Sequence, residues 1–202
     1  MILGAEFYLR NNVTIVAREL LGKLLVTNID GQKTSGIITE TEAYQGVVDK
    51  ASHAYGGKLT NRTEVMYRPG GFAYVYLCYG IHSLFNVVTN RKDIPHAVLI
   101  RSIAPFEGIE HMLARARKGI NAKNIGVGPG KVSKLLGINY GLTGQRLTLD
   151  FINKSKQKEL TIWIEDLNEN PKKSEIEMSP RIGVDYAGDD ALLTYRYVYN
   201  RK

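Results

Sequence analysis

The sequence FAYVYLCYGIHSLFNVVT, residues 72–89, is an apolar, aromatic and β-branched run that one glycine interrupts. A proline and two glycines directly precede it. A run of this kind, bounded by turn residues and broken at Gly80, predicts a hairpin of two strands at about 72–78 and 83–89. The strands then join at residues 79–82, Tyr-Gly-Ile-His.

Both faces of the first strand are apolar, because alternation places Tyr74 and Tyr76 on one face and Val75 and Leu77 on the other. We therefore expect the hairpin to be mostly buried. Tyr79 differs because it comes at the turn, where burial is hardest. A large aromatic side chain at this position calls for a functional reason.

Asn86 is the one amide side chain in the otherwise apolar second strand. A buried amide without hydrogen bonds destabilises the fold. Asn86 is therefore expected either to tie down a loop or to contact a ligand.

Upstream of the hairpin, the chain alternates between helical and strand patterns. Asparagines at positions 11 and 12 can cap a helix over residues 13–21, which Gly22 ends. Strands are expected at 24–29 and 34–43, on either side of an Asp-Gly turn. Strict alternation puts three side chains on one face at the end of the second strand: Glu40, Glu42 and Tyr44.

The segment 45–71 has little periodicity and many polar or turn residues. A segment this long without strand or helix patterning is usually functional or disordered. Its aromatic and basic side chains favour a binding surface.

The remaining elements follow from shorter signals. They are a strand at 97–103 that Pro105 ends, a helix at 107–118, a glycine loop and helix at 125–137, an irregular region at 139–159 with an ordered turn at 147–151, a strand at 160–164, a charged loop through Lys173, a loop at 180–190 and a last strand at 192–198. Together they predict an α+β fold in one domain, residues 1–202. Its mainly antiparallel sheet curves towards a barrel, with short flanking helices and a protruding hairpin.

The totals describe a basic protein without a disulfide framework. There are 27 basic and 20 acidic residues, a net charge of +7, and a pI of about 9.4. A pI above about 9 is typical of nucleic-acid-binding domains, although a mildly basic solvated surface gives the same total. Cys78 is the single cysteine, and neither a signal peptide nor an 18-residue apolar run is present. We expect an intracellular protein outside the membrane.

Glu42 is the first candidate for chemistry, because a carboxylate on a mostly apolar strand is either paired with a cation or used in a reaction. An ion pair with Arg101 is the simpler reading for an arbitrary glutamate. The neighbouring aromatic residues alter that balance, since with His53 and Arg101 they can form a pocket with an acid at its floor. The aromatic candidates are Tyr44, Tyr74, Tyr76 and Tyr79.

Five motifs, in order along residues 36–190, resemble those of the 3-methyladenine DNA glycosylases of the alkyladenine type. They are TETEAYQGVVDKASHAYGG at 39–57, RPGGFAYVYLCYG at 68–80, LIRSIAPFEG at 99–108, VGPGKVSKLLGI at 127–138 and RIGVDYAG at 181–188. The resemblance implies a monofunctional glycosylase that flips a damaged purine out of duplex DNA and hydrolyses its N-glycosidic bond.

The resemblance also implies a role for individual residues. Glu42 matches the general base that deprotonates the attacking water, and Arg101 matches the arginine that helps to hold that water. Tyr44, His53 and Tyr76 match the residues that sandwich and contact the flipped base.

Further matches concern DNA and specificity. Tyr79 matches the side chain that enters the minor groove and fills the gap left by the flipped nucleotide. Asn86 matches the amide that obstructs the exocyclic amino group of guanine. Arg62 is assigned to DNA binding, and Lys131, at the start of a helix, is read either as a phosphate contact or as a solvated lysine.

The same resemblance implies damaged duplex DNA as the partner, a monomer, no cofactor and no metal. Its fold is the barrel-like one shared with a formyltransferase C-terminal domain. A bifunctional lyase is not expected, because no lysine lies in the segments around Glu42, Tyr76 and Arg101. The expected substrates are 3-methyladenine, hypoxanthine, ethenoadenine and 7-methylguanine, in no predicted order.

Two other functions stay open from the residues alone. One is a noncatalytic module that binds single strands or lesions on its tyrosines. The other is a metal-dependent hydrolase, although its ligand spacing fits no recognised pattern. Its candidate ligands are Glu40, Glu42, Asp49 and His53.

Overall fold

The computed structural model describes residues 1–117, 124–148 and 161–201. Its strands are β1 (Leu24–Ile29), β2 (Gln32–Tyr44), β3 (Ala73–Cys78), β4 (His82–Thr89), β5 (His96–Glu107), β6 (Ile162–Glu165), β7 (Ile176–Ser179) and β8 (Arg196–Tyr199). Its α-helices are α1 (Ala5–Tyr8), α2 (Val13–Glu19), α3 (Ile109–Ala116) and α4 (Pro129–Leu136). Five 3₁₀ helices complete the described part: η1 (Tyr55–Gly57), η2 (Glu64–Tyr67), η3 (Tyr140–Leu142), η4 (Lys173–Glu175) and η5 (Asp185–Leu192).

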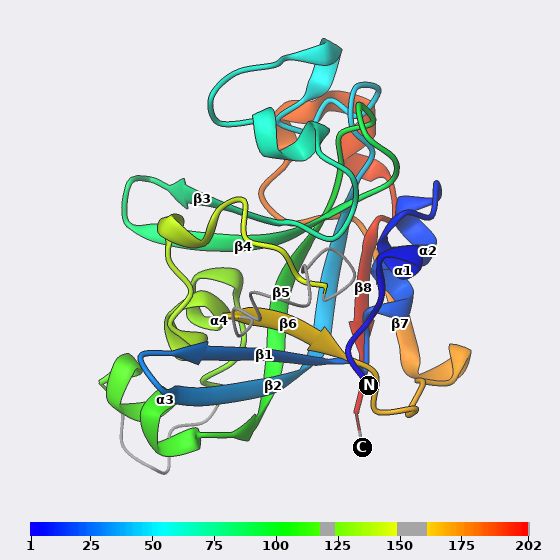
Figure 1. The fold of residues 1–202 in the computed structure, drawn as a ribbon. Coiled ribbons are helices and arrows are strands. Elements are labelled where there is room, and N and C mark those ends of the chain that lie inside the picture. The colour runs from blue at the N-terminus through cyan, green and yellow to red at the C-terminus, as the bar shows by residue number, and fades with distance from the viewer. Residues whose placement is uncertain (118–123, 149–160, 202) are drawn as a thin grey trace.

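The eight strands form one sheet in the order β3-β4-β5-β2-β1-β6, and β8 pairs with both β2 and β7 (Figure 1). The strand pairs are antiparallel. The prediction of an α+β fold with a mainly antiparallel sheet is therefore confirmed. Among the described strands, β3 and β6 stand at the two ends of this order and do not pair with each other. The sheet is therefore not closed into a barrel.

The long strands β2 and β5 run through the centre of the sheet (Figure 1). Their register shifts on both sides of Glu40, which pairs with Ser102, while Thr41 pairs with Ile100. Arg101 is thus the extra residue of a bulge opposite Glu40. Bulges redirect side chains, and this one brings a guanidinium against two carboxylates of β2.

The expectation that Pro105 ends the fifth strand is wrong, because β5 continues to Glu107. Pro105 pairs with Gly36 where the register shifts again. A proline lacks the backbone N–H of a regular ladder, but it is tolerated at such an irregularity. The strand therefore bends without stopping.

The β3–β4 hairpin is confirmed, and so is the expectation that it is mostly buried with Tyr79 exposed at the turn. Tyr74 and Val75 are 2% and 0% exposed, whereas Leu77 and Tyr79 near the tip are 46% and 92% exposed. Leu77 was expected on an apolar face, but near the tip the strands extend past the core (Figure 1). Apolar composition does not tell where the neighbouring layer ends.

Helices cover the sheet through apolar contacts. Asn12 caps α2, since its side-chain oxygen accepts hydrogen bonds from the amides of Thr14 and Ile15. The helix α4 begins with Pro129 at its first turn, as predicted, and packs on β4 and β5. The core that these elements share includes Leu20, Leu25, Ile38, Phe85, Ile100 and Leu135.

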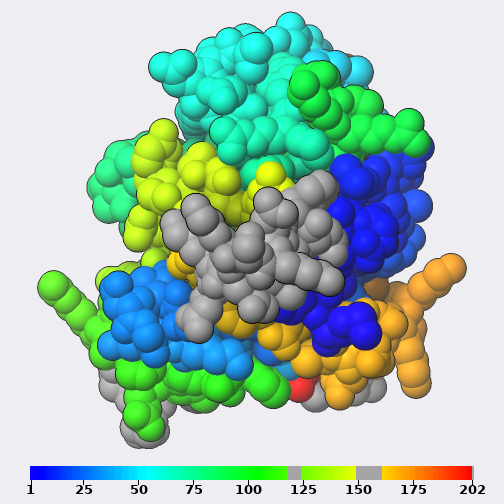
Figure 2. Space-filling view, viewed as in Figure 1, coloured from blue at the N-terminus to red at the C-terminus, as the bar shows by residue number. Residues whose placement is uncertain are grey.

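The segment 45–71 contains no strand and forms the upper end of the molecule, in cyan in Figure 2. It is held down by a second apolar cluster, in which Val65 and Met66 pack with Tyr74 of the hairpin. Packing of this kind helps to fix a segment that contains no strand. It carries His53 and Arg62 to the base of the hairpin.

Other predictions are confirmed with shifted ends. The helix expected at 107–118 is α3, which begins after Gly108, and Lys118 lies outside the described residues. The strand expected at 160–164 is β6, and residues 149–160 of the region before it also lie outside the description, including the end of the expected 147–151 turn. The strand expected at 192–198 starts only at Arg196, because η5 extends to Leu192, past the end of the expected loop.

The strand β7 was not expected, because its sequence lies in a charged region. None of the helices in residues 1–117, 124–148 and 161–201 is long and apolar enough to cross a bilayer.

Candidate active site

A cavity of about 270 Å³ lies between the base of the hairpin, the end of β2 and the 181–186 segment. Six residues expected at the site line it: Tyr44, His53, Tyr76, Tyr79, Asn86 and Arg101. Tyr74, Leu99 and Tyr186 add to its walls. The volume is just below the range of roughly 300–1,000 Å³ typical of drug-sized ligands, so it suits one small, flat molecule.

Glu42 lies behind this lining and is fully buried. Its Oε1 accepts a hydrogen bond of 2.8 Å from the amide of Ile182, and its Oε2 accepts one of 2.8 Å from the hydroxyl of Tyr44. Burial raises the pKa of Glu42, against the opposing effects of Arg101 and these two donors. The acid is thus next to the pocket, not on its exposed floor.

Arg101 lies between two carboxylates that strand alternation and the bulge bring to one side. Its Nε donates to Glu40 at 3.0 Å, and its Nη1 lies 3.4 Å from Oε1 of Glu42. Both expected roles of Glu42, ion pairing and proximity to the pocket, are therefore compatible with its position. The closer partner of Arg101 is Glu40.

Glu40 is held by three donors. It accepts hydrogen bonds from Ser102, from Arg196 and from Arg101. Burial alone raises the pKa of Glu40, but these hydrogen bonds and the two positive charges outweigh it and lower the pKa. Two glutamates that are two residues apart thus have opposite pKa shifts.

Tyr44 lines the pocket and also donates a hydrogen bond to Glu42. Burial and the nearby Glu42 raise the pKa of Tyr44 well above its ordinary value, so it stays a donor to that carboxylate. The guanidinium of Arg181 lies 4.8 Å from the centre of its ring. This contact fixes the ring plane.

His53 is held between two hydrogen bonds in one tautomer. Its Nε2 is 3.1 Å from Nη2 of Arg62, which can only donate, and its Nδ1 is 2.7 Å from the hydroxyl of Tyr74. We therefore assign the proton to Nδ1. Burial, and secondly the charge of Arg62, lowers the pKa of His53 to about 4. The imidazole ring also packs edge-on against Tyr76, with ring centres 4.6 Å apart.

Asn86 is 3% exposed and lines the cavity. Its amide nitrogen donates to the carbonyl oxygens of Tyr74 and Leu84 at 3.1 and 3.2 Å. These bonds lock the side chain across the hairpin. The expectation that Asn86 ties down a loop is not met, because both carbonyl oxygens belong to β3 and β4 themselves.

The residues expected to contact DNA lie outside the pocket centre. Tyr79 sits at the hairpin tip with a φ of 51°, followed by Gly80 with a φ of 69°, as in a type I′ turn. Arg62 stacks 4.9 Å from the centre of the Tyr76 ring and does not line the cavity itself. Lys131 is exposed and lines an adjoining groove between α4 and the hairpin, which shares Tyr79 and Pro129 with the cavity.

The four candidate metal ligands do not come together. Asp49 forms a two-pronged ion pair with Arg181, and His53 is used by Tyr74 and Arg62. Within residues 1–117, 124–148 and 161–201, no group of three or more His, Cys, Asp or Glu side chains could hold a metal ion.

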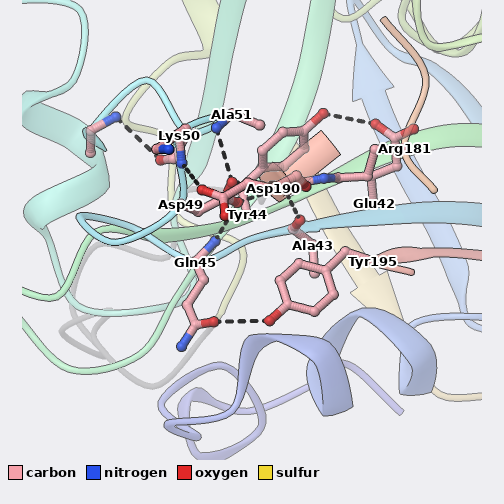
Figure 3. A network of polar contacts seen from close by, with 12 residues as sticks. Glu42, Ala43, Tyr44, Gln45, Asp49, Lys50, Ala51, Arg181, Asp190 and Tyr195 are labelled. Atoms are coloured by element: carbon pink, nitrogen blue, oxygen red, sulfur yellow. Dashed lines mark hydrogen bonds and ion pairs between the residues drawn. The ribbon is translucent and has the colours of Figure 1, made fainter. Parts of the chain in front are cut away.

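Sequence reasoning missed Arg181, which joins the strand β2 to the 181–190 segment (Figure 3). It also missed the amide of Ile182 as a donor to Glu42. The motif RIGVDYAG marked the region but not its contacts, since Asp49 and Arg181 are 132 residues apart. Only their opposite charges were a signal.

Comparison with known proteins agrees with the motifs. Residues 6–202 match the family Methylpurine-DNA glycosylase (MPG). A protein of Chlamydia abortus is 44% identical over all of this chain and all of its own length, and one of Clostridium perfringens is 44% identical over 98% of this chain and 95% of its own. A third, from Bacillus thuringiensis, is 44% identical over 91% and 89%. Each is named "Putative 3-methyladenine DNA glycosylase".

Proposed function

The chain belongs to the methylpurine-DNA glycosylase family, and on this premise we propose that it excises damaged purines from duplex DNA with a water that Glu42 activates. The substrates are alkylated or deaminated purines: 3-methyladenine, 7-methylguanine, hypoxanthine and ethenoadenine. The observation that carries the proposal is a fully buried carboxylate, paired with Arg101, directly behind an aromatic pocket.

The proposed reaction is a hydrolysis at C1′ of the deoxyribose. The water oxygen bonds to C1′, the C1′–N bond breaks, and the base leaves with the electron pair. Glu42 accepts the proton of the water and, while ionised, stabilises the positive charge that develops on the sugar. A carboxylate has about four acceptor positions, and the donors described above occupy only some of them.

The pocket favours a flat, electron-poor ring. Tyr44, Tyr74 and Tyr76 present aromatic surface to it. A cationic alkylated purine gains roughly 0.5–2 kcal/mol from such faces. Cationic bases also leave as neutral molecules, whereas hypoxanthine needs a proton. His53 is neutral near pH 7, so we assign it to base contact rather than to that proton transfer.

Entry of a base into this pocket requires it to leave the duplex. Extrusion costs a few kcal/mol, least for damaged or mismatched bases. We propose that Tyr79, on the exposed tip, fills the gap, since an apolar wedge recovers part of the lost stacking. Arg62 and Lys131 are proposed contacts to the phosphates. With a net charge of +7, binding should weaken as salt rises.

The reaction stops at an abasic site. A lyase needs an amine nucleophile at the sugar. In the described part of the chain, no lysine lines the cavity. We therefore propose a monofunctional enzyme. We also propose that it acts as a monomer.

Asn86 is proposed to exclude guanine through its exocyclic amino group. Its two hydrogen bonds to the backbone keep the amide from swinging away. Asn86→Ser should therefore raise excision of guanine relative to hypoxanthine, measured by competition between the two duplexes. An unchanged ratio would remove Asn86 from specificity.

The test is single-turnover release of free base from hypoxanthine-containing duplexes and from methylated DNA, with chelator present. Wild type should release base and leave an unbroken abasic strand, while Glu42→Gln binds the lesion but loses at least 100-fold in rate, the effect of removing a general base. Glu165→Gln is the matched control, because that carboxylate also accepts a hydrogen bond on a strand, from Trp163. If wild type binds lesions without releasing any base, the protein is a lesion-binding module instead.

A further inference from the structure

We propose that Arg181, fixed by Asp49, is a positioning residue that holds both hydrogen-bond donors on Glu42. This inference rests on the proposed role of Glu42 as the base. Arg181 touches neither the cavity nor any reacting atom, so it acts through its neighbours.

The side chain of Arg181 is fully buried and connects three segments (Figure 3). Its Nη1 donates to the carbonyl oxygen of Ala43 at 2.9 Å and to Asp49 at 2.5 Å. Its Nη2 donates to Asp49 at 2.9 Å and to the carbonyl oxygen of Asp190 at 3.0 Å. One guanidinium therefore joins the end of β2, the loop after it and η5.

The first donor on Glu42 is held through the backbone. Ile182 directly follows Arg181, and its amide donates to Oε1 of Glu42 at 2.8 Å. Ala43, which directly follows Glu42, accepts from Arg181. Arg181 thus holds the residue after Glu42 and directly precedes the donor Ile182, so it fixes the backbone on both sides of this hydrogen bond.

The second donor is held through its ring. The guanidinium carbon of Arg181 lies 4.8 Å from the centre of the Tyr44 ring and 5.4 Å from that of Tyr195. The Tyr44 hydroxyl donates to Oε2 of Glu42. A shift of Arg181 therefore moves both donors together.

Asp49 provides the counter-charge for Arg181, and its own side chain is held in place. Besides Arg181, its two oxygens accept hydrogen bonds from the amides of Gln45 and Ala51. A buried ion pair of this kind need not add stability, because desolvation offsets the attraction. Moreover, the Nε of Arg181 is buried without a hydrogen-bond partner among the described residues. An arrangement optimised for stability alone would satisfy that donor.

Arg181→Lys leaves the other charged or titratable groups around Glu42 unchanged. They are Arg101 on β5, Glu40 and Tyr44 on β2, Tyr76 on β3, and Tyr186 on the 181–186 segment. Arg181→Lys keeps the positive charge and removes the bidentate hydrogen bonding to Asp49. It therefore separates position from charge.

The experiment measures single-turnover excision by wild type, Arg181→Lys and Asp49→Asn between pH 4 and 9, together with lesion affinity. We expect kcat to fall on the order of 10- to 100-fold with little change in affinity, as for a misplaced catalytic group. In Arg181→Lys, which keeps the charge, the acidic limb of the rate profile should move to higher pH, because weaker hydrogen bonds favour protonated Glu42. The double variant should lose no more than either single one, since the pair acts as a unit.

Lys23→Gln is the control, since the buried Lys23 forms another, partly buried ion pair, with Asp166. It should lower the midpoint of thermal unfolding and leave the acidic limb in place. An unmoved limb in Arg181→Lys overturns the inference, and so does failure of both variants to fold, which assigns the pair to folding alone. Absence of excision by wild type is a different result, because it overturns the proposed function itself.

Discussion

The buried network around Glu42 and the exposed tip of the β3–β4 hairpin hold their functional side chains in opposite ways. Glu42 is 0% exposed and has hydrogen bonds or ion pairs to Tyr44, Ile182 and Arg101. Tyr79 is 92% exposed and sits on a turn with positive φ. Glu42 is placed by many contacts, whereas the direction of Tyr79 follows from the shape of the turn.

This difference separates stability from function in the two regions. A buried charge is tied to the free energy of unfolding, because removing one partner leaves the other unpaired. An exposed side chain can change with little effect on stability. Truncating an exposed side chain at the tip should therefore change activity more than stability, whereas substitutions in the network should affect both.

The largest effect on stability is expected from Glu40→Gln. Two arginines, Arg101 and Arg196, then lose their shared carboxylate, and the free energy of unfolding at pH 7 should fall by about 3 kcal/mol, as for a broken buried pair. The pKa of Glu40 is lowered in the fold, so this contribution is present above the ordinary glutamate range and is lost as the pH falls through the lowered value. Urea unfolding at pH 7 and pH 3 checks both statements.

Glu107→Gln is the matched control for that loss. Its ion pair with Lys33 is about half exposed, so it should change the free energy of unfolding by less than about 0.5 kcal/mol. Equal losses in the two variants would mean that burial does not distinguish the network from the surface.

The next effect is expected at the tip. Tyr79→Ala should slow excision from duplex DNA about tenfold, equivalent to roughly 1.4 kcal/mol, because the wedge is lost. Excision from single-stranded DNA should change less, and stability should not change. Single-turnover rates on both substrates check this, with Tyr140→Ala as a control at another exposed tyrosine. A substantial loss of stability would contradict the comparison.

A smaller effect of the opposite sign is expected from Tyr79→Asn. Positive φ is unfavourable for a bulky residue, and Asn-Gly is the preferred sequence for this type of turn. The variant should gain about 0.5–1 kcal/mol in stability while excising as slowly as Tyr79→Ala. Thermal and urea unfolding measure the gain. A variant no more stable than wild type would show that the turn is not strained.

The two regions also differ in what the sequence predicts about them. The hairpin and its tip follow from local signals, the apolar run and the Tyr-Gly turn. How far the tip extends past the core did not follow, because burial depends on layers far away in the sequence. The eight-stranded order, the bulge at Glu40 and the strand β7 depend on the same distant contacts.

The candidate site shows this limit most clearly. Alternation and the motifs brought Glu42, Tyr44 and Arg101 to one pocket edge. No local pattern indicates that Asp49 pairs with Arg181, and the sequence alone leaves Asp49 open as a metal ligand. A charge whose partner lies on another segment has no signature in its own neighbourhood.

His53 lies on the boundary between the two regions, since it contacts Tyr74 and Tyr76 of the hairpin from the 45–71 segment. Its pKa is lowered to about 4 by burial first and by Arg62 second. The neutral form therefore stabilises the fold above the ordinary histidine range, and that contribution is lost as the pH falls through about 4. Excision should show no step from His53 between pH 5 and 8.

The smallest effect is expected from Arg62→Ala, which removes the lesser of the two causes. The pKa of His53 should rise but stay below its ordinary value, because the ring remains buried. Arg62→Lys keeps the charge and should shift it less. NMR titration of the imidazole measures all three proteins. If wild type titrates in the ordinary range, the ring is open to water, and His53 belongs with the exposed tip rather than with the buried network.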